Sequence, residues 1–178
     1  IAILTGSTPF IVFGHSFGGL LAYHTIRSLS LHHQKLPTTF IASCVPSPRL
    51  SALSSLTQPL SMYNDSMDDR EFEVLFSSFG WLPLSESQRL PLKVIRSQVV
   101  AMHLWATRCI KQQPSPLPCP LIALAASNDS VIPDISQVAD WLSFTSCHFR
   151  FKHIYGTHTL YLKPPSLLRQ ALEHACTS

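Results

Sequence analysis

A serine between two glycines stands where an apolar segment meets an amphipathic one. Residues 10–13 (Phe-Ile-Val-Phe) form a continuous β-prone run, typical of a strand covered on both faces, and Gly14 ends it. Residues 14–18 then read Gly-His-Ser-Phe-Gly, and residues 18–31 carry apolar side chains at helical spacing. A serine in such a sharp turn projects its hydroxyl from the top of a sheet, and flanking glycines avoid collisions there. The feature therefore predicts a sheet strand that feeds directly into a helix.

The pattern of strands and helices continues along the chain with one interruption. Residues 38–45 predict a second buried strand, which completes a strand–helix–strand unit. Residues from about 50 to 116 show no strand signal and two helical patterns, near 68–76 and 92–110, so they predict a helical insertion. The α/β pattern then resumes with a strand at 121–126, a helix at 135–144, a strand at 147–154 and a last helix at 164–176. The sequence predicts one α/β domain over residues 1–178, with a mostly parallel sheet flanked by helices.

Composition excludes several classes of protein. Hydrophobic residues make up 46% of the chain and charged residues 13%, whereas disordered chains have low hydrophobicity and high charge. No apolar run reaches the roughly 18 residues of a membrane-spanning helix, and the 13 basic residues are scattered, unlike a nucleic-acid-binding patch. The five cysteines are widely spaced and form no C-x-x-C pair. We therefore expect a cytoplasmic protein with reduced, mostly buried thiols, no metal, no cofactor and no nucleic-acid partner.

A nucleophilic serine needs a base, and the base needs an acid that orients it. In nucleophile-elbow proteins the chain order is serine, acid, histidine. Asp129 comes three residues after the predicted strand 121–126, and His158 follows the strand 147–154 in a Gly-Thr-His loop. All three side chains thus lie at the carboxyl ends of predicted strands. We expect Ser16 to be the nucleophile, Asp129 the acid and His158 the base.

Other residues compete for these roles. Asp134 is typical of a first-turn helix acid, and His148 and His153 lie inside a predicted strand. His15 is expected to aim its side chain away from the serine hydroxyl. Three further acids that follow Ser16 lie in the predicted helical insertion: Asp65, Asp68 and Asp69. Developing negative charge on the substrate would face the helix N-terminus and the backbone amide of Phe17.

Five stretches resemble the type II thioesterases of polyketide, nonribosomal-peptide and fatty-acid synthesis, which have the α/β-hydrolase fold. They are residues 9–22, 40–49, 72–80 and 117–141 and the loop around His158 with Leu160 and Leu162. The resemblance implies hydrolysis of acyl thioesters, with acyl groups carried on the phosphopantetheine arm of an acyl or peptidyl carrier protein. It assigns the same roles to Ser16, Asp129 and His158. The insertion at about 50–116 would be a lid, where Phe76, Trp81 and Met102 either line the acyl channel or form ordinary core.

The chain departs from this family in three places. Thr157 precedes His158 where glycine is common, Ala126 to Asn128 precede Asp129 without the usual glycine, and Ser97 and Gln98 follow Arg96 where an aspartate is usual. The family's opening strands, with the loop that gives the second oxyanion amide, have no counterpart before Ile1. We therefore expect residues 1–178 to be a partial domain. A carboxylesterase or lipase with the same triad, and an inactive truncated hydrolase, remain alternatives.

Overall fold

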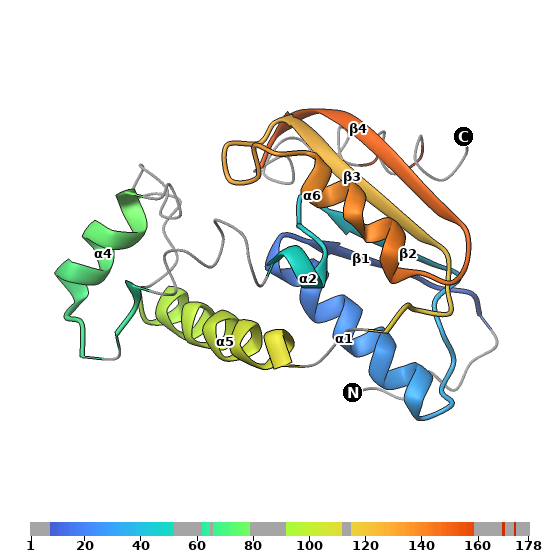
Figure 1. The fold of residues 1–178 in the computed structure, drawn as a ribbon, viewed down its shortest axis with the longest axis horizontal. Helices are drawn as coiled ribbons and strands as arrows, with labels where there is room; N and C mark the ends of the chain where they lie inside the picture. The colour runs from blue at the N-terminus through green and yellow to red at the C-terminus, as the bar shows by residue number, and fades with distance from the viewer. Residues whose placement is uncertain are drawn as a thin grey trace. The chain divides into compact units, whose positions relative to one another are not determined.

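The computed structural model divides the chain into two compact units. One consists of Ile1–Pro48 with Pro114–Ser178, and the other of Arg49–Gln113. The structure describes residues 8–51, 62–64, 66–78, 92–111 and 115–158 together with residues 169 and 173 (Figure 1). The second unit spans the segment in which the sequence shows helical patterns and no strand signal.

The first unit is built on a parallel sheet with the strand order β1-β2-β3-β4 (Figure 1). The strands are β1 (Ile11–His15), β2 (Thr39–Ser43), β3 (Leu121–Asn128) and β4 (Phe149–Thr157). The β3 burial pattern shows its first six residues buried, as expected for a strand covered on both faces. Because all four strands are parallel, their carboxyl ends meet at one edge of the sheet, which is the edge where the elbow serine follows β1.

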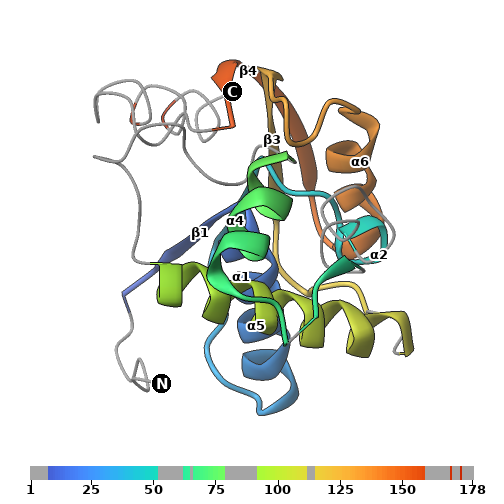
Figure 2. The same ribbon diagram turned by 90° about the vertical axis from the view of Figure 1, so that its left-hand side faces the viewer.

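Helix α1 (Phe17–Leu31) returns along one face of the sheet and forms a core with the segment after β3 (Figure 1 and Figure 2). That segment contains α6 (Ser136–Ala139) and the 3₁₀ helix η2 (Asp140–Phe144). Trp141 is fully buried, and its ring meets Tyr23 of α1 at 5.8 Å and Phe40 of β2 at 5.6 Å between centroids. The Trp141 Nε1–H donates to the Val45 carbonyl at 2.8 Å, so the indole is also satisfied as a donor.

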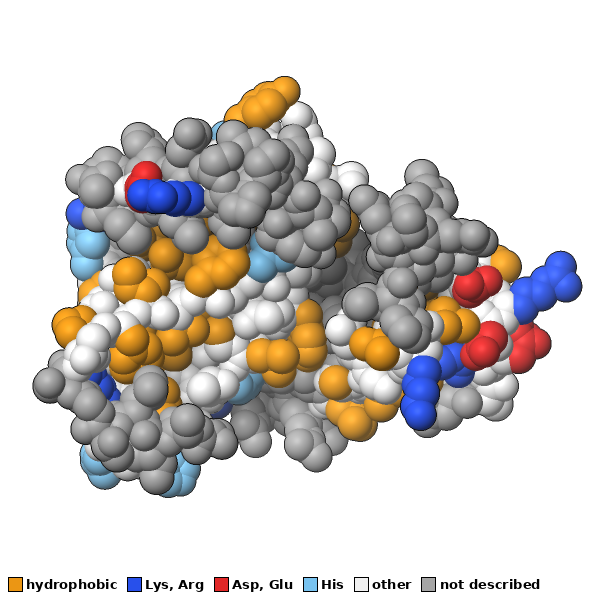
Figure 3. Space-filling view, turned by 180° about the vertical axis from the view of Figure 1, so that it is seen from behind, with side chains coloured by type: hydrophobic (Ala, Val, Ile, Leu, Met, Phe, Trp, Pro, Cys, Tyr) orange, Lys and Arg blue, Asp and Glu red, His pale blue; other side chains and the backbone are white. Residues whose placement is uncertain are grey.

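The opposite face of the sheet presents alternate apolar side chains. Ile41, Ile122 and Leu124 are buried there, and Phe13 and Ile154 pack against them. Figure 3 looks toward this side of the sheet and shows apolar side chains gathered among backbone atoms and other side chains. Successive side chains of a strand point to opposite faces, so a continuous apolar run in the sequence places apolar residues on both faces of the sheet, as observed here.

The second unit contains α4 (Asp69–Ser78) and α5 (Leu92–Lys111), and α2 (Pro48–Ser51) lies where the two units meet in the sequence. Phe72 and Phe76 of α4 stack at 4.4 Å between centroids and form a core with Val99 of α5. Phe76 therefore has the packing role that the sequence left open. Trp81 and the side chain of Met102 lie outside the described residues.

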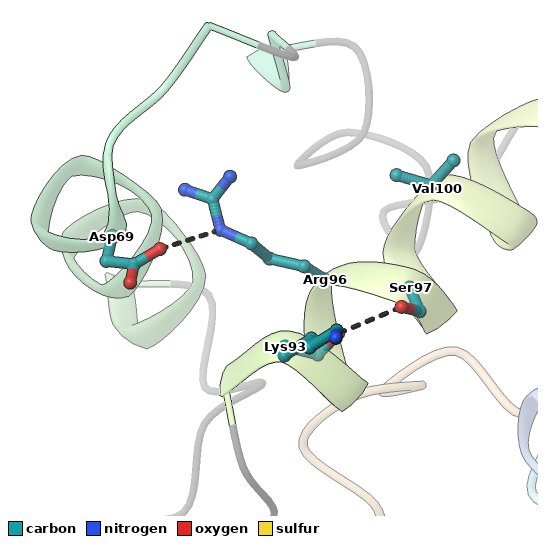
Figure 4. Close-up of a pocket in the computed structure, with 5 residues that line it drawn as sticks. All are labelled: Asp69, Lys93, Arg96, Ser97 and Val100. Carbon is teal, nitrogen blue, oxygen red and sulfur yellow. Dashed lines mark hydrogen bonds and ion pairs between the residues drawn. The ribbon is translucent and has the colours of Figure 1, made fainter.

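Polar contacts fix the start of α4. The Asp68 carboxylate accepts from the Glu71 N–H at 2.8 Å, and the Glu71 carboxylate accepts from the Asp68 N–H at 3.0 Å, which is a reciprocal capping box. Arg96 of α5 donates to the carbonyls of Met67 and Asp68 at 2.7 and 2.6 Å. It also pairs with Asp69 at 3.1 Å across a hollow lined by Lys93, Ser97 and Val100 (Figure 4).

The ends of several elements differ from the sequence prediction. The first strand continues through Gly14 and His15, and β3 includes Ser127 and Asn128, which we expected in a turn. The last strand includes Gly156 and Thr157, since Thr157 pairs with Asn128 after a shift in register. The helix predicted at 135–144 divides into α6 and η2.

Two further predictions concern long elements. The helix predicted at 164–176 lies outside the described residues apart from 169 and 173. No helix in the described part of the chain is both long enough and apolar enough to cross a bilayer.

Candidate active site

Ser16 occupies a strained turn between β1 and α1. Its backbone has φ 51° and ψ −133°, a conformation that side-chain-bearing residues rarely adopt. The Ser16 N–H donates to the Ser43 carbonyl at 2.8 Å, and its own carbonyl accepts from the Gly19 N–H at 2.8 Å. These bonds tie the turn to the end of β2 and to the first turn of α1, which offsets part of the strain. The serine therefore stands at the elbow that the sequence predicts.

The glycines around the turn have different reasons to be glycine. A Cβ added to Gly14 would lie 2.6 Å from the Gly18 carbonyl oxygen and from the Gly19 Cα. A Cβ on Gly19 would lie 2.6 Å from a Val45 methyl group, whereas one on Gly18 meets nothing within 4 Å. The expected collision is thus present at Gly14, but the expectation is wrong for Gly18. The second tight approach is at Gly19, where α1 passes the segment after β2.

Asp129 directly follows β3 and is buried, with 7% of its surface exposed. Its Oδ1 accepts from the backbone N–H groups of Val131 and Ile132, both at 3.0 Å, so the turn after β3 holds the carboxylate in place. Burial alone would raise the pKa of Asp129. The hydrogen bond from His158, the His158 charge and the two backbone donors outweigh burial and lower the pKa. Asp129 is therefore ionised at neutral pH.

His158 directly follows β4 and reaches both other predicted residues. Its Nδ1 lies 2.9 and 3.0 Å from the two carboxylate oxygens of Asp129, and its Nε2 lies 3.0 Å from the Ser16 hydroxyl oxygen. An ionised carboxylate only accepts hydrogen bonds, so the proton belongs on Nδ1. In the neutral ring Nε2 then accepts from the Ser16 hydroxyl, which is the arrangement of a base able to remove that proton.

Phe17 is the first residue of α1. Its backbone N–H is among the first four of the helix, which have no acceptor inside the helix. This leaves the amide available next to Ser16, at the helix end that favours negative charge.

The competing acids and histidines are engaged elsewhere. Asp134 is exposed, and its Oδ1 accepts from the Ser136 N–H at 3.0 Å at the start of α6. His148 accepts from Arg150 at 3.0 Å, and His153 is exposed on β4. Of the acids in the second unit, Asp68 caps α4 and Asp69 pairs with Arg96, while Asp65 lies outside the described residues.

Cys44 follows β2 and has a positive φ of 48°. Burial, and then the charge of Asp129, raise the pKa of this thiol to about 12. The thiol is therefore neutral at physiological pH and is no rival nucleophile. Within the described ranges, no group of three or more His, Cys, Asp or Glu side chains could hold a metal ion.

His15 is a residue of this site that sequence reasoning missed. Its ring centroid lies 5.1 Å from that of His158, and its Nδ1 lies 3.2 Å from the Ser43 hydroxyl oxygen at the end of β2. We expected the side chain to be aimed away from the serine hydroxyl, and these two contacts are indeed to other groups. The sequence did not show that β1 extends through His15, and this extension places the His15 ring beside the end of β2.

Comparison with known proteins identifies the family. A family model for the thioesterase domain matches residues 2–175. The chain belongs to this thioesterase family. Thioesterase PikA5 from Streptomyces venezuelae is 29% identical over 151 residues, which are 82% of this chain and 49% of that protein. The chain therefore spans about half the length of this curated relative.

Solved thioesterase structures share the fold. They include YbtT, a type II thioesterase from the yersiniabactin pathway, at 22% identity and a TM-score of 0.68 over 98% of this chain and 68% of that one. RedJ, from the prodiginine pathway of Streptomyces coelicolor, is 24% identical with a TM-score of 0.64, over 93% of this chain and 62% of that one. Human thioesterase 2 is 19% identical with a TM-score of 0.65, over 97% of this chain and 74% of that one. The predicted α/β-hydrolase fold and the predicted thioesterase family are both confirmed.

Proposed function

We propose that the chain is a serine hydrolase of the type II thioesterase kind, which cleaves acyl thioesters on the phosphopantetheine arm of an acyl or peptidyl carrier protein. The observation that carries the proposal is the position of the His158 imidazole, within 3.0 Å of the Ser16 hydroxyl on one side and within 2.9 Å of the Asp129 carboxylate on the other. Membership of the thioesterase family supports the choice of a thioester as the bond that is broken.

In the first half of the proposed reaction, Ser16 attacks the thioester carbonyl. His158 Nε2 takes the hydroxyl proton as the Oγ–C bond forms, and Asp129 stabilises the resulting imidazolium through Nδ1–H. The carbonyl oxygen becomes an oxyanion, for which the Phe17 amide is the proposed donor. Collapse of this intermediate breaks the C–S bond. The thiolate leaves with the proton from His158, and the acyl group stays on Ser16 as an ester.

In the second half, water replaces the thiol. His158 removes a proton from the water as its oxygen attacks the acyl ester, and the new tetrahedral intermediate again bears an oxyanion. Collapse breaks the bond to Ser16 Oγ, which regains its proton from His158. The products are a carboxylic acid and the free enzyme, and no redox step or cofactor is needed to balance the sequence.

The carrier-bound substrate is supported by two structural neighbours: YbtT, a type II thioesterase from the yersiniabactin NRPS/PKS pathway, and ClbQ, from the colibactin NRPS/PKS pathway. The same arrangement of serine, histidine and aspartate also cleaves oxygen esters, so a carboxylesterase is the competing activity. Turnover of acyl-carrier protein against a p-nitrophenyl ester of the same acyl chain decides between them. We expect the higher kcat/KM for the carrier-bound thioester, and a clear preference for the oxygen ester would contradict the proposed substrate.

The roles within the site are tested with a fluorophosphonate probe, which labels activated serines. We expect the unaltered chain to be labelled at Ser16 and His158→Ala to lose nearly all labelling, since the base is removed. The matched control is His153→Ala, which removes an exposed imidazole from β4 five residues earlier. Loss of labelling in His153→Ala, with His158→Ala unaffected, would overturn the assignment of the base.

A further inference from the structure

His15 is held by the sheet at the residue just before the serine. It is the last residue of β1 and pairs in register with Ser43, the last residue of β2. Its Nδ1 and the Ser43 hydroxyl oxygen are 3.2 Å apart, within hydrogen-bond contact, and Ser43 is fully buried. The imidazole is thus tethered to a neighbouring strand whose position is fixed by main-chain pairing, so its freedom to rotate is small.

The same ring also contacts the ring of His158. The two ring centroids are 5.1 Å apart at an interplanar angle of 54°, and the His15 side chain also interacts with the backbone of His158. His158 follows β4, which is separated from β1 in the sheet by β2 and β3. His15 therefore reaches across the carboxyl edge of the sheet to the residue that bridges Ser16 and Asp129.

We propose that His15 is a positioning residue for His158: tethered to Ser43, its imidazole braces the His158 ring in the orientation that joins Ser16 to Asp129. The inference rests on the proposed function, because it assigns His15 a part in the reaction through the proposed base. It adds a third contact to the His158 ring, besides the Asp129 carboxylate and the Ser16 hydroxyl. Catalysis by proton transfer depends on that orientation, and misplacement of a catalytic group by about 1 Å can cost on the order of a hundredfold in rate.

The charge state of His15 fits this role. Burial, and then the charge of His158, lower the pKa of His15 to about 4, so its ring is neutral at pH 7. In the proposed reaction His158 becomes positively charged when it takes the Ser16 proton. A neutral neighbour in ring contact does not oppose that charge, whereas a cation in the same place would repel it.

The test measures the rate of fluorophosphonate labelling at Ser16 in a double-mutant cycle. His15→Phe keeps a ring of similar size but loses both nitrogens, and we expect it to slow labelling roughly ten- to hundredfold. If His15 acts through His158, the same substitution in the His158→Ala background should slow the residual labelling no further. The matched control is His153→Phe, which makes the same change at an exposed site on β4 and should label at the unaltered rate.

Two milder variants cover the case in which His15→Phe does not fold. His15→Gln keeps a hydrogen-bonding side chain toward Ser43 but loses the ring that contacts His158, and it should label more slowly than the unaltered chain. Ser43→Ala removes the tether but leaves both imidazoles, and should also slow labelling. Circular dichroism and thermal unfolding identify the folded variants. If only these two fold, labelling of both within twofold of the unaltered chain would overturn the inference.

The outcomes separate the inference from the function beneath it. If the unaltered chain is not labelled at Ser16, the proposed function fails and the inference fails with it. If the unaltered chain is labelled and folded His15→Phe labels within twofold of it, only the inference is overturned. An equal slowing by His15→Phe in the presence of His158 and in the His158→Ala background would show that His15 acts on the fold or on the serine, and would also overturn it.

Discussion

Acidification should destabilise the chain through His15. Burial and the charge of His158 lower the pKa of this ring from 6.5 to about 4 in the folded chain. Between these values the unfolded chain binds the proton more readily, so the His15 contribution to stability is complete above about pH 6.5 and falls as the pH drops toward 4. One pKa unit corresponds to about 1.4 kcal/mol, which gives a loss of up to about 2 kcal/mol between pH 7.5 and pH 5. This value is an upper limit because the ring is partly exposed.

The assay is urea unfolding at pH 7.5 and at pH 5 of the unaltered chain, His15→Gln and His153→Gln. Glutamine does not titrate, so His15→Gln should lose up to about 2 kcal/mol less stability over this interval than the unaltered chain. His153→Gln is the matched control, the same replacement at an exposed residue of β4. Groups that do not contact His15 titrate equally in the compared chains and cancel in the difference. Equal losses in the unaltered chain and His15→Gln would refute the lowered pKa of His15.

Two further predictions concern the acid and the elbow. Asp129→Asn should lower kcat at least about a hundredfold relative to Asp134→Asn, because it removes the carboxylate that holds the His158 proton on Nδ1. Equal losses of kcat in steady-state assays of the two variants would mean that the acid is misassigned. Gly14→Ala should lower the free energy of unfolding by about 1–3 kcal/mol because its methyl group meets fixed backbone, whereas Gly18→Ala should raise it by roughly 0.5–1 kcal/mol. Chemical unfolding that gives the reverse order would contradict the packing of the elbow.

The sequence predicts the elbow and the meeting of Ser16, Asp129 and His158 because the signals are local. Each residue follows an apolar run that reads as a strand, and parallel strands bring their carboxyl ends to one edge of the sheet. Knowing that three segments are parallel strands is therefore enough to expect the three side chains at the same edge. The precise register is not needed for that expectation, so the errors of two or three residues at the ends of β3 and β4 do not affect it.

The contacts of His15 and Gly19 could not be predicted in the same way. The neighbours of His15 are Ser43 and His158, which lie 28 and 143 positions later in the chain, and the contact depends on the register between β1 and β2. Gly19 is tight because Val45 approaches α1, which depends on how closely the helix packs against the segment after β2. The sequence shows which residues near a turn are small, but the tertiary contact that each one makes determines which of them must be small.

The most direct test of the proposed reaction is intact-protein mass spectrometry of the chain mixed with an acyl-pantetheine thioester and quenched rapidly in acid. We predict a mass increase equal to one acyl group, peptide mapping of that group to Ser16, and release of one thiol for each acyl-enzyme formed in the first turnover. Ser16→Ala should show neither the adduct nor the burst of thiol. Release of thiol at an undiminished rate by Ser16→Ala, or an acyl group found on another residue, would contradict the serine mechanism.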